Sequence, residues 1–168
     1  YDNVNVRLLL KNAHPYNVLN CQERYPEKID LVTDYLDKDK LQDLFYTGDI
    51  FLLPSKQVHS ASLTDAFSYG MPVIGSTSWG MSEYCVNALN SLTGDVGMGH
   101  LHRRDRKIVD DSYVDKILPR LTAICGDRGM LAKMSENTLA WYNSNHSREN
   151  HKANLHRLVD LAISRHVK

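Results

Sequence analysis

The feature that most constrains this chain is a strand–helix–strand unit near its middle. Residues 49–53 (DIFLL) form an apolar run that is typical of a buried strand. The helical stretch that follows ends at Gly70, and Pro72 prevents the helix from continuing. Residues 71–75 (MPVIG) form a second apolar strand. Two buried strands joined through a helix indicate a parallel pair, which is the building unit of α/β sheets.

The same alternation extends towards the N-terminus. Apolar runs at 4–10 (VNVRLLL) and 28–32 (KIDLV) predict two more strands. Asp39 is placed to cap a helix that Gly48 ends. The whole pattern predicts an α/β fold, in which a Rossmann-like parallel sheet is flanked by helices.

Helical patterns dominate the C-terminal half. After a turn at 76–80, Met81 or Ser82 is expected to open a helix, and a loop or hairpin is expected beyond Leu92. Three extra C-terminal helices then follow: one holds Tyr113, Ile117, Leu121 and Ile124 and is bent by Pro119, one covers 130–142, and one starts near Ser147 with Leu155, Leu158, Val159 and Ala162 on one side.

Length and charge limit the function classes. The 168 residues suffice for one domain with a sizeable core, and a formal net charge of zero argues against a nucleic-acid partner. No apolar run approaches the roughly 20 residues of a membrane span. Cys21, Cys85 and Cys125 lie far apart, which favours reduced thiols in a cytoplasmic protein. The chain opens at Tyr1 without a methionine, so we expect it to be part of a longer protein.

A small, polar loop follows the strand at 49–53 and leads into the helix. Ligands of parallel sheets bind beyond the carboxyl ends of the strands, and free N–H groups at a helix N-terminus suit a phosphate. Ser62 is expected to cap this helix, with Asp65 completing a capping-box-like pair. Taken alone, the loop also fits a purely structural role in which Asp65 only caps its helix.

Residues 28–84 resemble the C-terminal domain of family 4 (group 1) glycosyltransferases, which have the two-domain GT-B architecture. That family combines a D-(V/I)-F-(V/L)-L-P-S strand, an E-G-F-G-x-x-x-x-E-A segment, a G-x-P-V-I strand and a G-G-x-P-E turn. The matching residues, with the spacing kept, are Asp49-Ile50-Phe51-Leu52-Leu53-Pro54-Ser55, Asp65-Ala66, Gly70-Met71-Pro72-Val73-Ile74 and Gly80-Met81-Ser82-Glu83. The resemblance implies that residues 1–168 form a single donor-binding domain, with the N-terminal acceptor domain and a first strand outside the chain.

The resemblance also implies a role for each matching position. Asp65 stands where the family's second glutamate binds the ribose hydroxyls, and a carboxylate can accept hydrogen bonds from both. Gln57 stands where the first glutamate touches the donor sugar, and His59 takes the aromatic position of the motif. The catalytic candidates are therefore Gln57 and His59, and the candidates for binding the donor nucleotide are Lys56, Ser60, Ala61, Ser62, Leu63 and Asp65.

Several departures from the family pattern bear on activity. Gln57 keeps hydrogen bonding but loses the charge of glutamate, and Val58 and Ser60 replace the two glycines of the motif. The arginine and lysine that neutralise the pyrophosphate in the family are expected upstream of this chain. Trp79 either covers the ligand or packs on the next helix, and the basic run at 103–107 fits a solvated loop. His100 and His102 have no further metal ligand at useful spacing, so no metal is expected. Residues 4–10 are a candidate for the first strand of the sheet, which is otherwise expected upstream of this chain.

The main interpretation is a retaining, metal-independent glycosyltransferase that needs no cofactor. Its donor would be a nucleotide-diphosphate sugar, such as a UDP-, GDP- or ADP-sugar, and its acceptor a glycan, lipid or protein held by the missing domain. This part of the protein alone is expected to be inactive. The alternatives are a non-catalytic, degenerate binding module, favoured by Gln57, and a sugar-nucleotide epimerase of the same architecture. Peripheral membrane contact through the full-length protein and a homo-oligomer are left open.

Overall fold

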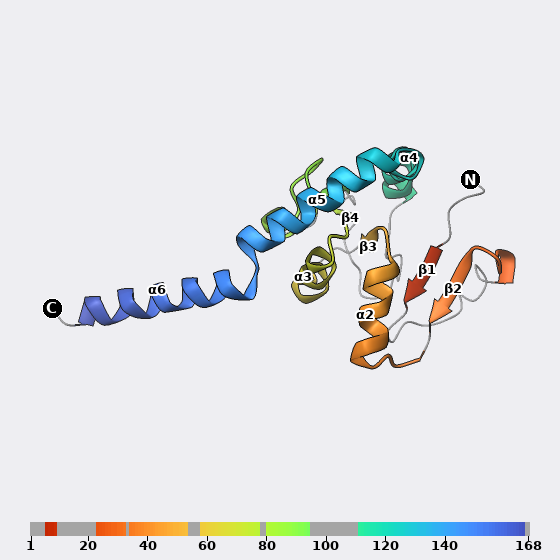
Figure 1. Ribbon diagram of the computed structural model, residues 1–168. Helices are drawn as coiled ribbons and strands as arrows, with labels where there is room; N and C mark the ends of the chain where they lie inside the picture. The colour runs from red at the N-terminus through yellow and green to blue at the C-terminus, as the bar shows by residue number, and fades with distance from the viewer. Residues whose placement is uncertain are drawn as a thin grey trace, which may run out of the picture. The chain divides into compact units, whose positions relative to one another are not determined.

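The computed structural model describes residues 6–9, 23–32, 34–53, 58–77, 80–94 and 111–166. The contacts within the chain divide it into two compact units, over residues 1–44 and 45–168. Figure 1 traces the order of their elements.

The first unit contains a two-stranded parallel sheet. The two strands predicted from the apolar runs are confirmed as β1 (Val6–Leu9) and β2 (Ile29–Val32), and the structure pairs them. Helix α2 (Lys38–Thr47) begins in this unit and stops before Gly48, also as predicted. Its cap was placed wrongly, because Asp37 Oδ1 accepts a hydrogen bond from the Lys40 amide at 2.9 Å while Asp39 lies inside the first turn.

The second unit is built on a three-stranded parallel sheet in the order β3-β4-β5. Strand β3 (Phe51–Leu53) pairs with β4 (Val73–Ser76), which confirms the strand–helix–strand prediction. Strand β5 (Ser91–Gly94) lies on the other side of β4 and was not predicted, because it is too short and polar to show periodicity. The loop or hairpin expected beyond Leu92 falls almost entirely on residues 95–110, which lie outside the described residues.

Helix α3 (Ser60–Ser68) connects β3 to β4 and buries Leu63, Ala66 and Phe67. The predicted Ser62 cap and its pairing with Asp65 are wrong, because the helix begins three residues earlier, with His59 at the N-cap and no side-chain cap. The predicted end of α3 is confirmed. Gly70 has a φ of +70°, the left-handed conformation that favours glycine, and its amide donates to the Phe67 carbonyl at 3.0 Å.

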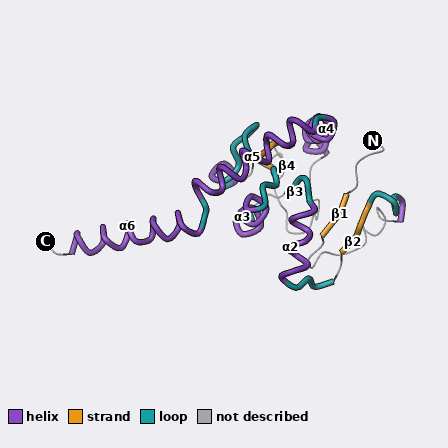
Figure 2. Tube along the Cα trace, viewed as in Figure 1, coloured by secondary structure: helices purple, strands orange, loops and turns teal. Residues whose placement is uncertain are grey.

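Three long helices close the unit, in agreement with the predicted helical patterns (Figure 2). They are α4 (Asp111–Gly126), α5 (Arg128–Asn145) and α6 (Arg148–His166). The helix expected at Met81 is only a single 3₁₀ turn, η1 (Met81–Glu83), which starts from Gly80 at φ +83°. Among the described residues, no helix is both long and apolar enough to cross a lipid bilayer.

Both faces of strand β4 are buried, and each belongs to a different part of the core. Ile74 packs with side chains of β5, α4 and α5, whereas Val73 packs with Leu63 and Phe67 of α3 and with Met81. Successive residues of a strand point to opposite faces of the sheet, so the two clusters lie on its two sides. This layering, helices over both faces of a parallel sheet, is the predicted α/β arrangement.

Candidate functional site

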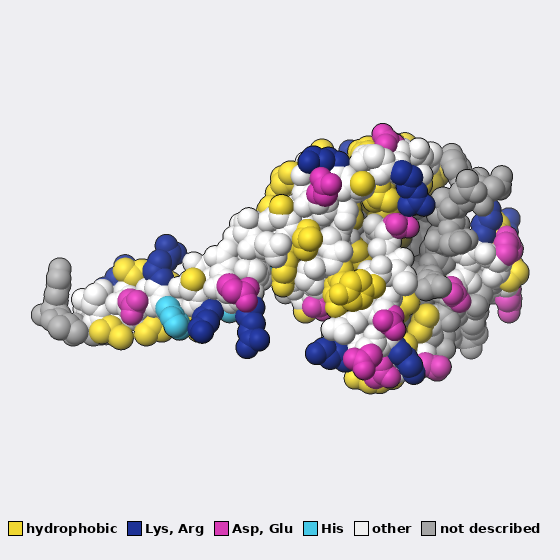
Figure 3. All heavy atoms as spheres, in the orientation of Figure 1, with side chains coloured by type: hydrophobic (Ala, Val, Ile, Leu, Met, Phe, Trp, Pro, Cys, Tyr) yellow, Lys and Arg dark blue, Asp and Glu magenta, His cyan; other side chains and the backbone are white. Residues whose placement is uncertain are grey.

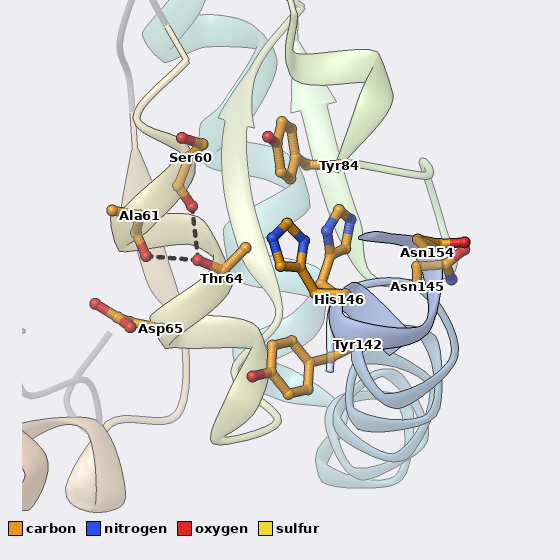
Figure 4. A pocket seen from close by; sticks show the side chains of 10 residues that line it. Ser60, Ala61, Thr64, Asp65, Tyr84, Tyr142, Asn145, His146 and Asn154 are labelled. Carbon is orange, nitrogen blue, oxygen red and sulfur yellow. Dashed lines mark hydrogen bonds between the residues drawn. The ribbon is translucent and has the colours of Figure 1, made fainter. Parts of the chain in front are cut away.

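A cavity of about 380 Å³ lies at the N-terminal end of α3 (Figure 4). Strand β3 leads into this helix, so the cavity is at the carboxyl end of a parallel strand, where open α/β sheets bind ligands. The lining residues come from α3, from the end of η1, from the C-terminal end of α5 and from α6: Ser60, Ala61, Thr64, Asp65, Tyr84, Tyr142, Asn145, His146, His151 and Asn154.

The α3 side of the cavity is the start of a helix. The amide of Leu63 donates to the His59 carbonyl at 3.0 Å, so the amides of residues 60–62 lie ahead of the first intrahelical hydrogen bond. Thr64 Oγ1 lies 2.9 Å from the carbonyl oxygens of both Ser60 and Ala61, which fixes its rotamer. Amides without an intrahelical partner and the positive end of the helix dipole make this side suitable for an anion.

The opposite side of the cavity is a cluster of aromatic rings. The rings of Tyr84 and His146 stack at a centroid distance of 5.1 Å and an interplanar angle of 17°. The Trp141 ring lies 4.8 Å from His146 and makes an edge contact of 5.4 Å with Phe67 of α3. Because Phe67 is fully buried, this chain of rings ties the α5–α6 junction to the core.

His146 ends helix α5, and its backbone amide donates to the Tyr142 carbonyl at 2.8 Å. Burial lowers the pKa of its imidazole below the ordinary 6.5, so the ring is neutral at pH 7. Asp65 is the one carboxylate among the described residues that line the cavity. Within the described residues, no group of three His, Cys, Asp or Glu side chains is placed to hold a metal ion.

The structure brings three of the residues expected to bind the donor into this cavity: Ser60, Ala61 and Asp65. His59 and Ser62 are exposed beside it but do not line it. Leu63 differs from the expectation, because its side chain is buried in the core and its amide already donates to His59, so it presents neither group to a ligand.

The remaining candidates from the sequence lie outside the described residues. They are Lys56 and Gln57 in the loop before α3, Trp79, His100, His102 and the basic run at 103–107.

The α5–α6 side of the cavity was missed by sequence reasoning. Its residues belong to two helices that were predicted correctly, but no motif links the junction of those helices to the start of α3. Among these residues, only Tyr84 lies next to a sequence motif, since it directly follows the turn at 80–83 that matches the family pattern. Only the packing of α5 against α3 brings the two sides together.

Comparisons with known proteins bear on the fold. No protein-family model matches the chain, and no curated protein matches its sequence. Among solved structures, Alr3699/HepE from Anabaena in complex with UDP matches with a TM-score of 0.67 and 11% identity, over 94% of this chain and 41% of that one. The C-terminal domain of a glycosyl transferase group 1 family protein (LpcC) from Francisella tularensis matches with a TM-score of 0.60 and 12% identity, over 79% of this chain and 64% of that one.

This chain has the GT-B C-terminal-domain fold. Sucrose-phosphate synthase from Thermosynechococcus elongatus shares it with a TM-score of 0.70 and 12% identity, over 94% of this chain and 38% of that one. Alr3699/HepE was also solved with UDP-glucose. The structural matches confirm the predicted fold. The chain spans about two-fifths of the length of Alr3699/HepE and of the synthase.

Proposed function

We propose that this chain is the donor domain of a glycosyltransferase and binds a nucleoside diphosphate sugar at the start of α3. One observation carries the proposal: Asp65 and the first turn of α3 line the same cavity at the carboxyl end of β3. The GT-B fold supports it, since a protein with that fold has been solved with UDP and with UDP-glucose.

The chemistry of the α3 side fits the two charged parts of such a donor. The amides of residues 60–62 and the helix dipole would hold the diphosphate, with Lys56 in the preceding loop as the cation. Asp65 would accept hydrogen bonds from both ribose hydroxyls. Gln57 and His59, which precede this turn, would contact the sugar or the phosphate next to it.

Transfer itself would proceed with retention and without a metal. The departing diphosphate assists deprotonation of the acceptor in this scheme, so catalysis depends on orientation and on stabilising the leaving group. The acceptor would be held by the part of the protein that corresponds to the rest of the longer GT-B chains. Gln57 also favours a second candidate, a domain that binds the donor without transferring it, because a neutral amide cannot act as a charged catalytic group.

Calorimetric titration of this chain with UDP, GDP and ADP tests the proposal. We expect one nucleotide to bind, and Asp65→Asn to weaken it by roughly 10- to 100-fold, the loss expected when charge-assisted hydrogen bonds are removed. Asp65→Glu restores the family residue and should retain binding. Asp115→Asn removes an exposed carboxylate on α4 outside the cavity and is the matched control, which should bind as the unchanged chain does.

Two results would contradict the proposal: no binding of any of the three nucleotides by the folded chain, or equal losses in the Asp65→Asn and Asp115→Asn variants. Transfer or hydrolysis of the donor by the complete protein separates the transferase from the second candidate. Binding with neither activity would favour the binding module.

A further inference from the structure

Helix α6 carries most of its apolar side chains at the surface. Every side chain from 151 to 165 is exposed in the described structure. Five of them are large hydrophobic residues that are 47–58% exposed: Leu155, Leu158, Val159, Leu161 and Ile163. Figure 3 shows hydrophobic side chains along this helix. Apolar side chains that gather on one exposed element mark an interaction surface, whereas single ones scattered over a protein do not.

These side chains, together with Ala162, form one side of the helix. Leu155 is followed at the i+3, i+4 and i+7 positions by apolar residues, and positions with this spacing lie on one helix face. Leu161 and Ile163 border that stripe. The apolar side therefore has six members among nine consecutive residues: Leu155, Leu158, Val159, Leu161, Ala162 and Ile163. It is broader than the seam of a coiled coil, which needs only two apolar residues in each heptad.

The charges of α6 are sorted with respect to the apolar side. The helix contains four lysine and arginine residues and two carboxylates. Glu149 and Asp160 are eleven residues apart, which is about three helical turns, so both lie on the side opposite the apolar residues. Arg148, Lys152 and Arg165 each lie seven residues, or about two turns, from a member of the apolar side. Basic groups therefore flank both ends of the apolar side, and the carboxylates lie away from it.

This arrangement fits an anionic lipid surface better than a second copy of the chain. Long basic side chains can place their charged ends among lipid headgroups while neighbouring apolar side chains enter the boundary below. Within the part of the chain that the structure describes, no ion pair involves a charge of α6. Two copies that met through their apolar sides would bring basic residues together without the carboxylates, and like charges repel across an interface.

We propose that α6 is an interfacial helix, which binds the surface of an anionic membrane with its apolar side in the headgroup boundary. Arg148, Lys152 and Arg165 contact the lipid phosphates, whereas Glu149 and Asp160 face the water. The inference does not rest on the proposed function, because lipid binding by α6 requires no nucleotide.

Co-sedimentation of the chain with lipid vesicles tests the role of charge. We expect the chain to bind vesicles of phosphatidylcholine and phosphatidylglycerol in equal parts, and to bind pure phosphatidylcholine much more weakly. Lys152→Gln should weaken binding about fivefold, the contribution of one basic residue near an anionic surface. Lys116→Gln removes the same charge from an exposed position of α4 and is the matched control, which should bind as the unchanged chain does.

A second pair of variants tests the apolar side. Leu158 of α6 is 57% exposed and Leu118 of α4 is 49% exposed, so neither substitution opens a core cavity. Leu158→Ala should weaken vesicle binding on the order of tenfold, because it removes apolar groups that enter the lipid boundary. Leu118→Ala should leave binding unchanged.

Amide hydrogen exchange identifies the segment that meets the lipid without any substitution. Vesicles that contain phosphatidylglycerol should slow exchange along α6, because a helix that is marginal in water is stabilised at the membrane surface. Exchange along α4 should not change. This measurement stands even if a variant alters the folding of α6.

Four results would overturn the inference: no binding to the mixed vesicles, equal binding to both kinds of vesicle, equal losses in the Lys152→Gln and Lys116→Gln variants, or slowed exchange in α4 but not in α6. Dimerisation in sedimentation velocity that Leu158→Ala abolishes, without vesicle binding, would assign the apolar side to a second copy instead. Nucleotide binding without vesicle binding would leave the proposed function standing, and vesicle binding without nucleotide binding would leave this inference standing.

Discussion

Helices α5 and α6 follow one another in the chain and have nearly the same length, 18 and 19 residues, yet they are stabilised in different ways. Helix α5 packs on α3 and buries Leu131, Met134 and Thr138, the first two in a core cluster with Ile74 of β4. Every side chain of α6 from 151 to 165 is exposed in the described structure, and Figure 3 shows hydrophobic side chains of this helix at the surface. The comparison teaches that an apolar helical stripe does not by itself predict burial.

Local interactions hold the beginning of α6. Ser147 Oγ accepts a hydrogen bond from the Asn150 amide at 3.2 Å, and Asn150 Nδ2 donates to the Ser144 carbonyl at the end of α5. An isolated helix of this length is marginally stable in water. We therefore expect α5 to open only when the second unit unfolds and α6 to open at a much lower free energy.

The largest expected effect comes from truncating one leucine in each helix. Leu131 is 7% exposed and Leu158 is 57% exposed. Leu131→Ala leaves a cavity in the core and should lower the free energy of unfolding by about 2–5 kcal/mol, whereas Leu158→Ala should change it by less than about 0.5 kcal/mol. Urea denaturation measures both. Similar losses of unfolding free energy in the two variants would mean that α6 is packed in solution as α5 is.

The next largest effect concerns the packing of the α3–β4 turn on α5. A side chain at Gly70 would adopt a φ of +70° and place its Cβ 3.0 Å from Ser135 Oγ of α5. Gly70→Ala should therefore cost about 1–2 kcal/mol. Gly126→Ala meets no atom within 4 Å and should be close to neutral, which makes it the control for adding a methyl group. A neutral Gly70→Ala variant would show that this turn is not held against α5.

The caps of the two helices sharpen the comparison on a smaller scale. Asp127 Oδ1 accepts a hydrogen bond from the Met130 amide at 2.9 Å and caps α5, as Ser147 caps α6. Asp127→Ala should destabilise the second unit by about 1 kcal/mol, because α5 is part of its core. Ser147→Ala should instead speed amide hydrogen exchange along α6 and leave the global unfolding free energy unchanged. If both variants lowered the global free energy of unfolding, α5 and α6 would not unfold separately, and the comparison would fail.

The smallest effect is a pH dependence at the junction of the two helices. Because burial lowers the pKa of His146, the unfolded chain takes up its proton at a higher pH than the folded chain. The stability contributed by the neutral ring is present above about pH 6.5 and is lost as the pH falls through the lowered pKa. His146→Asn should flatten the decline in stability below pH 6.5, and the exposed-site variant His156→Asn should preserve it. An unchanged slope in His146→Asn would assign the decline to other groups.

The residues on the two sides of the cavity also differ in how well the sequence predicts them. Those on the α3 side could be predicted, because a strand, a polar loop and a helix start follow one another in the chain. Those at the α5–α6 junction could not, because no motif links them to α3. The N-cap was misplaced by a few residues, since Ser62 and Asp65 have the composition of a capping pair while His59 occupies the cap. Helix and capping propensities are weak predictors of where a helix begins. The position of α3 depends instead on the burial of Leu63 and Phe67 in the core.

By itself, the sequence determined the parallel strands β3 and β4, the end of α3 at Gly70 and the existence of three C-terminal helices, and through the spacing of its motifs it pointed to the GT-B fold. These features depend on neighbours in the chain, and periodicity and turn residues record them. Only the tertiary structure decided that β5 completes the sheet, that Leu63 belongs to the core, and that Tyr84 and His146 face the start of α3. Contacts between distant segments decide these features, and the local pattern of residues does not record such contacts.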